Sequence, residues 1–390
     1  MRLRTVLLLL AAALLLGVER PRDLGDVTDV RHWSYADYTR VVVELTRPVE
    51  PEVHRLPAQP GRPERLYLDL GGIWVGRRYE DPIPVEDGLL HAVRLGQNTL
   101  QRTRVVIDLA RYDHHRLLLL SSPARVVVDV FGRRAGPGTG EPASPRKPGA
   151  EGGRLPPELR PIRTVVIDPG HGGKDPGAVG VTRLLEKDVT LRLARALAPR
   201  LESRGFRVVL TRTADETLSL EERTALAEGV GGDVFVSLHA NAARRRSAHG
   251  IETYYLDATH ERHTLRLAAL ENGVAPRHLD ELQRTLATLR VSAVSDQSAA
   301  LARDVHGALV SGLRARWRDV ADLGVKRGPF YVLFLSSMPA ILIESGFLTN
   351  APEARRLDSP EYLGRTAERI AEGIARYRAR RAMVLAGGAP

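Results

Sequence analysis

The chain has 390 residues, of which 43% are apolar and 27% charged, so it is long enough for two globular domains. It contains no cysteine, which excludes disulfides, thiolate metal ligands and a cysteine nucleophile, so any metal must be bound by His, Asp or Glu. The formal net charge of +10 favours an acidic polymer as a partner. Because the arginines are scattered and only 5% of residues are aromatic, we expect no nucleic-acid binding.

The N-terminus resembles an export signal. Arg2 and Arg4 precede an apolar run from Val6 to Leu16, which is short for a membrane span and suits a signal-peptide core. No small-x-small cleavage site follows Gly17. We therefore interpret residues 1–20 as a signal peptide or an uncleaved anchor, and we expect a periplasmic protein.

Residues 24–132 have the pattern of an all-β domain. Strand-like runs at 39–45 and 65–71 recur at 103–109 and 125–132, with turn residues between them. Two similar halves predict one β-sandwich built from a duplicated sheet. The strand spacing and the repeat resemble the AMIN domain, and this resemblance implies peptidoglycan binding and placement of the protein at the division site.

Residues 133–160 are rich in Gly, Pro, Arg and Glu, and this composition predicts a flexible linker. Residues 161–380 then alternate between strand and helix patterns, which predicts a mainly parallel sheet flanked by helices. The expected strands are 164–167, 207–210, 233–238, 250–256, 330–335 and 340–343, and the expected helices are 188–201, 220–227 and 360–380. Pro199 should kink or end the first helix. Ser219 should cap the second helix, with Glu222 completing a capping box.

Four polar residues follow or adjoin these strands, namely His171, Glu186, His239 and Glu344. Each alone has an ordinary interpretation as a turn, helix-start or strand-end residue. Together, two histidines and a carboxylate form a familiar ligand set for catalytic zinc, with the fourth position left to water. A further carboxylate such as Glu344 could take a proton from that water and pass it to a leaving amine.

The catalytic half resembles the N-acetylmuramoyl-L-alanine amidase family called Amidase 3. The matching stretches include VVIDPGHGGKDPGA at 165–178, FVSLHAN at 235–241 and MPAILIESGFLTN at 338–350. The resemblance implies that His171, Glu186 and His239 bind zinc and that Glu344 is the catalytic acid/base. The implied reaction is hydrolysis of the amide bond between N-acetylmuramic acid and L-alanine in peptidoglycan, for wall remodelling and daughter-cell separation.

Residues 257–300 form an insertion in this pattern. Leucines at 279, 282, 286 and 289 predict an amphipathic helix over 278–290. Some periplasmic members of the family carry a helical insertion here that covers the active site until a partner protein displaces it. The hypothesis is that this insertion does the same and offers Glu271 or Glu281 to the zinc. The alternative is a peripheral helix with no regulatory role.

Two other functions fit parts of the sequence. A zinc peptidase acting on peptidoglycan stem peptides would use the same metal chemistry with different substrate contacts. A non-catalytic wall-binding scaffold for division would not need the four polar residues. We expect the chain to act as a monomer.

Overall fold

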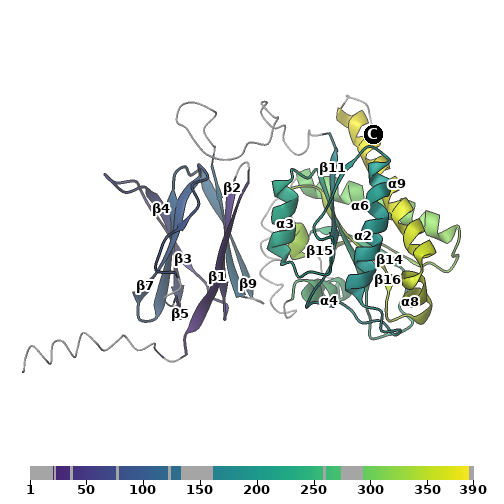
Figure 1. The fold of residues 1–390 in the computed structure, drawn as a ribbon, viewed down its shortest axis with the longest axis horizontal. Coiled ribbons are helices and arrows are strands. Elements are labelled where there is room, and N and C mark those ends of the chain that lie inside the picture. The colour runs from purple at the N-terminus through teal and green to yellow at the C-terminus, as the bar shows by residue number, and fades with distance from the viewer. Residues whose placement is uncertain are drawn as a thin grey trace, which may run out of the picture. The chain divides into compact units, whose positions relative to one another are not determined.

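The computed structural model describes residues 21, 23–35, 38–75, 79–121, 124–132, 161–257, 261–273 and 293–385. The chain forms two compact units, residues 1–144 and 145–390 (Figure 1). The export signal expected at 1–20, the linker expected at 133–160 and the helix expected at 278–290 lie outside the described residues. In the part of the chain that is described, no helix has the length and apolar character needed to cross a membrane.

The first unit contains two five-stranded sheets, with the orders β5-β1-β2-β10-β9 and β3-β4-β8-β7-β6. The strands are β1 (Gly25–Ser34), β2 (Tyr38–Leu45), β3 (Glu52–Leu56), β4 (Glu64–Gly71), β5 (Ile73–Trp74), β6 (Ile83–Pro84), β7 (Leu90–Thr99), β8 (Arg102–Leu109), β9 (His114–Ser121) and β10 (Ala124–Phe131). Alternate residues of the central strands point inward and form a single apolar core between the sheets. The predicted β-sandwich is confirmed.

The two similar halves of the sequence do not form one sheet each. β2 of the first half pairs with β10 of the second, with Val43 opposite Val126. In the other sheet β4 of the first half pairs with β8 of the second, with Leu68 opposite Val105. Each sheet therefore contains strands from both halves of the sequence, so neither half forms a complete sheet by itself.

The second unit contains a six-stranded sheet with the order β12-β11-β13-β16-β14-β15. Its strands are β11 (Thr164–Pro169), β12 (Arg207–Leu210), β13 (Val234–Asn241), β14 (Ile251–Leu256), β15 (Asp322–Gly328) and β16 (Ala340–Phe347). All neighbours pair in parallel except β14 and β16, which are antiparallel. This arrangement confirms the predicted mainly parallel sheet flanked by helices.

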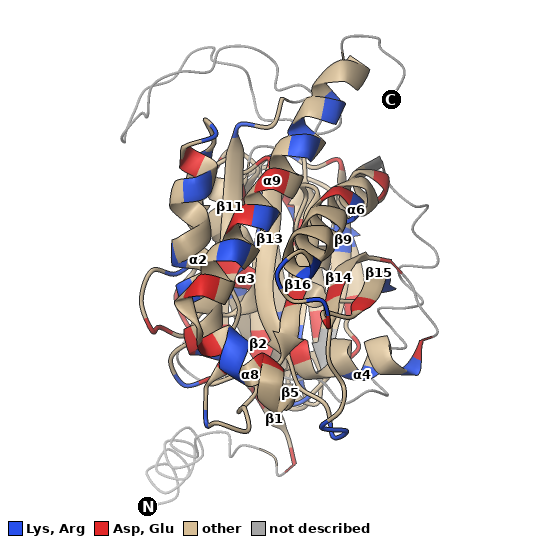
Figure 2. Ribbon diagram, turned by 90° about the vertical axis from the view of Figure 1, so that its right-hand side faces the viewer, with Lys and Arg blue, Asp and Glu red and all other residues tan. Residues whose placement is uncertain are grey.

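Helices pack on both faces of this sheet (Figure 1). On one face, α2 (Glu186–Glu202), α6 (Ala293–Arg314) and α9 (Pro360–Leu385) share an apolar core with inward residues of β11, β13 and β16. Along these helices basic and acidic residues are interspersed (Figure 2). The opposite face carries α3 (Leu220–Gly229) and α7 (Tyr331–Phe334). Asn272, directly after α4 (Arg262–Glu271), joins α4 to α7 by hydrogen bonds to Pro329 and Tyr331. The remaining described helix is α8 (Ala351–Asp358).

Two local expectations need correction. The apolar run at 330–335 contains the short helix α7 instead of a strand, and the strand of this region is the preceding β15. A short apolar run buried on all sides has no periodicity that separates helix from strand. Of the two effects expected from Pro199, a kink or the end of the helix, the second does not occur, because α2 continues to Glu202. Because Pro199 lies in the last turn and the flanking Leu197 and Leu201 are buried, packing holds the helix despite one lost hydrogen bond.

Candidate active site

The four polar residues singled out in the sequence lie at the carboxyl edge of the parallel strands, where open α/β sheets build their sites. His171 follows β11, while His239 and Glu344 are opposite each other on the neighbouring strands β13 and β16. Glu186 is the first residue of α2. The structure therefore brings together residues that are up to 173 positions apart, as 344 − 171 shows.

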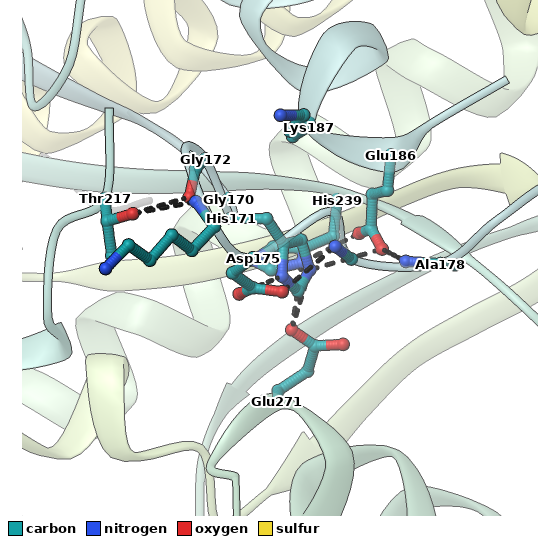
Figure 3. Close-up of polar contacts among 12 residues, drawn as sticks. Gly170, His171, Gly172, Asp175, Ala178, Glu186, Lys187, Thr217, His239 and Glu271 are labelled. Atoms are coloured by element: carbon teal, nitrogen blue, oxygen red, sulfur yellow. Dashed lines mark hydrogen bonds and ion pairs between the residues drawn. The ribbon is translucent and has the colours of Figure 1, made fainter. Parts of the chain in front are cut away.

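Glu186 joins the two histidines (Figure 3). Its carboxylate oxygens lie 3.2 Å from Nε2 of His171 and 3.0 Å from Nδ1 of His239. The same oxygens accept hydrogen bonds from the main-chain N–H groups of Ala178 and Ala240, at 2.8 and 3.0 Å. Burial disfavours the charged carboxylate, but the two imidazoles outweigh it and lower the pKa of Glu186.

Glu271, the last residue of α4, reaches into the same group. Its Oε2 lies 3.4 Å from Nε2 of His171 and 3.1 Å from Nδ1 of His239 (Figure 3). One ligand atom from each of His171, Glu186, His239 and Glu271 lies within 4.8 Å of all the others. Glu281, the other glutamate considered from the sequence, lies outside the described residues.

This group of side chains suits a cation. Burial disfavours the imidazolium form, but Glu271 and Glu186 outweigh it and raise the pKa of His239 to about 10. Glu186 and Asp175 likewise raise the pKa of His171 against the effect of burial. The site therefore stabilises positive charge, which protons or one divalent ion could supply. Nε2 of His171 is buried, and within the described residues its polar contacts are the ion pairs with Glu186 and Glu271, which leaves it available to a metal.

The loop around His171 needs glycine for steric reasons. A Cβ atom on Gly170 would lie 2.4 Å from Cε1 of His239, and one on Gly177 would lie 2.6 Å from Oε2 of Glu186. Gly177 also has a φ of +63°, in the left-handed region that favours glycine. These glycines let the main chain approach the imidazoles and the carboxylate closely.

Asp175 is a site residue that the sequence reasoning missed. Its Oδ2 lies 2.8 Å from Nδ1 of His171, so it orients the ring with Nε2 toward Glu186 (Figure 3). The available signal was its position four residues after His171 in the same glycine-rich loop.

Glu344 is fully buried, and neither of its carboxylate oxygens makes a hydrogen bond to any residue that the structure describes. Burial, together with the nearby carboxylates of Glu186 and Glu271, raises its pKa well above the usual range. The shift favours the protonated form of the carboxyl group, which is the form that a general acid needs.

Glu252, opposite Glu344 on β14, is a second missed residue. It accepts hydrogen bonds from Lys326 Nζ at 2.8 Å, Tyr254 Oη at 2.6 Å and Asn241 Nδ2 at 3.0 Å. An acid in the middle of a strand pattern, at 250–256, was the available signal. The two neighbouring carboxylates therefore differ: Glu252 accepts hydrogen bonds from charged and polar groups, and Glu344 accepts none within the described residues.

A second group with metal-ligand atoms lies in the first unit, at Glu52, His54 and Asp69. Arg102 pairs with Glu52 at 3.0 Å and Arg104 pairs with Asp69 at 2.7 Å. Since both carboxylates are already neutralised by guanidinium groups, this group is part of an ion-pair network on the sheet.

The fold and the site define an α/β hydrolytic enzyme with a candidate metal centre. Comparison with known proteins gives the class more narrowly. The family model described as N-acetylmuramoyl-L-alanine amidase matches residues 165–376, and the model of the AMIN domain matches residues 29–130.

Relatives match across both units. N-acetylmuramoyl-L-alanine amidase AmiC of Neisseria meningitidis is 29% identical over 382 residues, covering 90% of this chain and 89% of that protein. AmiC of Escherichia coli is 28% identical, covering 91% of this chain and 90% of that protein. Among solved structures, AmiC2 of Nostoc punctiforme is 36% identical with a TM-score of 0.44, covering 56% of this chain and 98% of that one.

Because the amidase model matches more than half of its residues, the chain belongs to the N-acetylmuramoyl-L-alanine amidase family. The predicted family and class of enzyme are thereby confirmed. The reaction is hydrolysis of the amide bond that joins the muramic acid of peptidoglycan to its stem peptide.

Proposed function

We propose that this amidase is zinc-dependent and that His171, Glu186 and His239 hold the ion. The observation that supports this proposal is the convergence of two imidazoles and a buried carboxylate beside the unpartnered Glu344. Two histidines and one carboxylate are a known catalytic zinc set. When bound there, zinc would act as a Lewis acid toward the substrate carbonyl and would lower the pKa of a water molecule.

The proposed role of Glu344 is to move one proton. It takes the proton from the attacking water as the C–O bond forms at the lactyl carbonyl. It then gives that proton to the nitrogen of L-alanine as the C–N bond breaks, so that the amine leaves uncharged. The raised pKa of Glu344 favours the second transfer, because it stabilises the protonated carboxyl group, whereas the first transfer needs the ionised form.

Product analysis tests this function against a zinc peptidase. Purified sacculi digested with the protein should release intact stem peptides with a free L-alanine amine, together with peptide-free glycan, as read by mass spectrometry. Peptides cut internally, with the muramic acid amide retained, would instead identify a peptidase.

We also propose that the insertion at 257–300 restrains the enzyme and that a partner protein releases it. The support is Glu271, whose carboxylate approaches both histidines and so competes with water for a ligand position. Its side chain is only 13% exposed and lies against both imidazoles, so we infer that it must move before a substrate carbonyl can approach the histidines. A partner that binds the displaced insertion would shift the population toward the open state.

Glu271→Gln tests this restraint. Loss of the carboxylate should raise the activity on sacculi without any partner, by about 5- to 150-fold for a typical coupling between two states. Glu202→Gln, an exposed glutamate at the end of α2, is the matched control and should leave the activity unchanged. Equal activity of Glu271→Gln and the wild-type protein would contradict the proposal.

The domain boundaries complete the proposed assignment. Residues 1–20 export the chain to the periplasm, residues 24–132 bind peptidoglycan, residues 133–160 link the two units and residues 161–380 carry out catalysis. The match of the AMIN model to residues 29–130 supports the second of these roles. Deletion of residues 1–20 should leave the protein in the cytoplasm on cell fractionation, and export of the truncated chain would contradict the first.

A further inference from the structure

The main chain that carries His171 has an unusual conformation. His171 has a φ of +60°, although it is not a glycine, and Gly172 and Gly173 follow with φ values of +130° and +60°. A left-handed residue other than glycine persists only where its surroundings impose it. The surroundings of this loop must therefore hold it in place.

Side chains from three other segments do so. Every main-chain carbonyl from Pro169 to Gly173 accepts a hydrogen bond from a side chain, and part of this arrangement is visible in Figure 3. The donors are Arg212, Arg223, Thr190, Thr217 and Lys187.

Two of these donors are arginines that are almost completely buried, with Arg212 1% and Arg223 4% exposed. Arg212 donates from Nε to the carbonyl of Pro169 and from Nη2 to that of Gly170, both at 3.0 Å. Arg223 donates from Nη1 to Pro169 and from Nη2 to His171, both at 2.7 Å. Together the two guanidinium groups bind three consecutive carbonyls that end at the candidate metal ligand.

Burying the charges of these two arginines costs free energy, which argues against a purely structural role. Arg223 pairs with the buried Asp168 at 2.8 Å. Within the described residues, no carboxylate lies at ion-pair distance from Arg212, whose partners are main-chain carbonyls and the hydroxyl of Thr190. Burial and the like charge of Arg223 lower the pKa of Arg212, although Asp168, Asp215 and Asp188 act in the opposite direction. Ordering a loop does not by itself require a buried cation of this kind.

We propose that Arg212 and Arg223 are positioning residues of the metal centre, which hold the main chain at 169–171 so that the imidazole of His171 points at the metal. This inference rests on the proposed zinc site. Residues that surround a metal site usually orient a ligand by contacting its side chain. Arg212 and Arg223 would instead orient His171 by contacting its main chain.

The test measures the zinc dissociation constant of the full-length protein by competition with a chromogenic chelator. Arg212→Lys and Arg223→Lys keep the positive charge but lose the planar fork that reaches two carbonyls at once. Each should weaken zinc binding about 10- to 100-fold. Each should also change the visible absorption spectrum of the cobalt-substituted protein, because the ligand geometry changes.

Arg40→Lys is the matched control. Arg40 is also fully buried and binds a carboxylate, with Nε 2.7 Å from Oδ1 of Asp129, but it belongs to the first unit. The Arg40→Lys variant should keep the zinc affinity and the cobalt absorption spectrum of the wild-type protein. An equal loss of affinity in this variant would show that any buried arginine has the same effect and would overturn the inference.

His171→Ala separates this inference from the proposed function. If this variant keeps the wild-type zinc affinity, the zinc site itself is wrong. If it loses zinc while both lysine variants bind as tightly as the wild-type protein, the positioning role is wrong. Should a lysine variant fail to fold, Thr190→Val and Thr217→Val each remove one hydroxyl donor to the loop. They should bind zinc several-fold more weakly, and unchanged affinity in both would contradict the inference.

Discussion

At the scale of the residue, Glu344 has the environment that bears most directly on catalysis, since it is buried opposite His239 and has no hydrogen-bond partner in the described part of the chain. Glu344→Gln keeps the shape of the side chain but removes the proton carrier. We expect kcat on sacculi to fall about 10²- to 10⁴-fold, with zinc content and peptidoglycan binding unchanged. A variant that retains the wild-type kcat would remove Glu344 from the mechanism.

Glu252, which lies opposite Glu344, should make the stability of the fold depend on pH. Burial disfavours its charge, but hydrogen bonds from His263, Lys326 and Tyr254 lower its pKa to about 2, against an ordinary value of 4.5. The ionised form therefore stabilises the fold fully above pH 4.5, and this contribution is lost as the pH falls toward 2.

Glu252→Gln should remove this contribution. We expect the free energy of unfolding at pH 7 to fall on the order of 3 kcal/mol. The difference from the wild-type protein should shrink as the pH is lowered from 4.5 toward 2, as measured by urea titration at each pH. A difference that stays constant over that range would show that the charge of Glu252 does not matter.

The sequence indicated which residues come together at the candidate site better than it indicated the residues that support them. His171, Glu186, His239 and Glu344 each stand in a recognisable motif, and the structure brings them to one edge of the sheet. Arg212 and Arg223 are ordinary arginines in the sequence. Their contacts with the His171 loop cross more than 40 positions, and no local pattern reports such contacts.

At the scale of the element, the start of α3 was predictable from the local sequence. Ser219 and Glu222 were expected to form a capping box, and the structure confirms it, with N–O distances of 3.3 and 2.7 Å. Ser219→Ala should cost about 1 kcal/mol of stability in urea unfolding, whereas Ser219→Asp keeps an acceptor and should stay close to the wild-type value. Equal stability of all three proteins would show that the cap is not needed.

Elements that depend on tertiary packing were predicted less well. The run at 330–335 has the composition of a strand, yet α7 forms there because its apolar side chains are buried on several sides and Asn272 binds the first helical N–H. β15 was missed since its burial pattern is mostly intermediate, without the alternation of a half-buried strand. In both cases the deciding contacts come from other segments of the chain.

At the scale of the whole molecule, composition and patterning predicted an all-β unit followed by an α/β unit, and both are found. The strand exchange between the two halves of the first unit was not predictable from the repeat. Similar strands have the same inward and outward alternation in either sheet, so the repeat alone does not select the pairing β2–β10 over pairing within a half.

The most direct test of the account is a crystal structure of the zinc-loaded protein with anomalous data collected at the zinc edge. We predict one anomalous peak at about 2.0–2.2 Å from a nitrogen of each of His171 and His239 and from an oxygen of Glu186, with the carboxyl group of Glu344 facing it. A zinc peak bound by other residues, or no peak at these three while the protein cleaves peptidoglycan, would contradict the account.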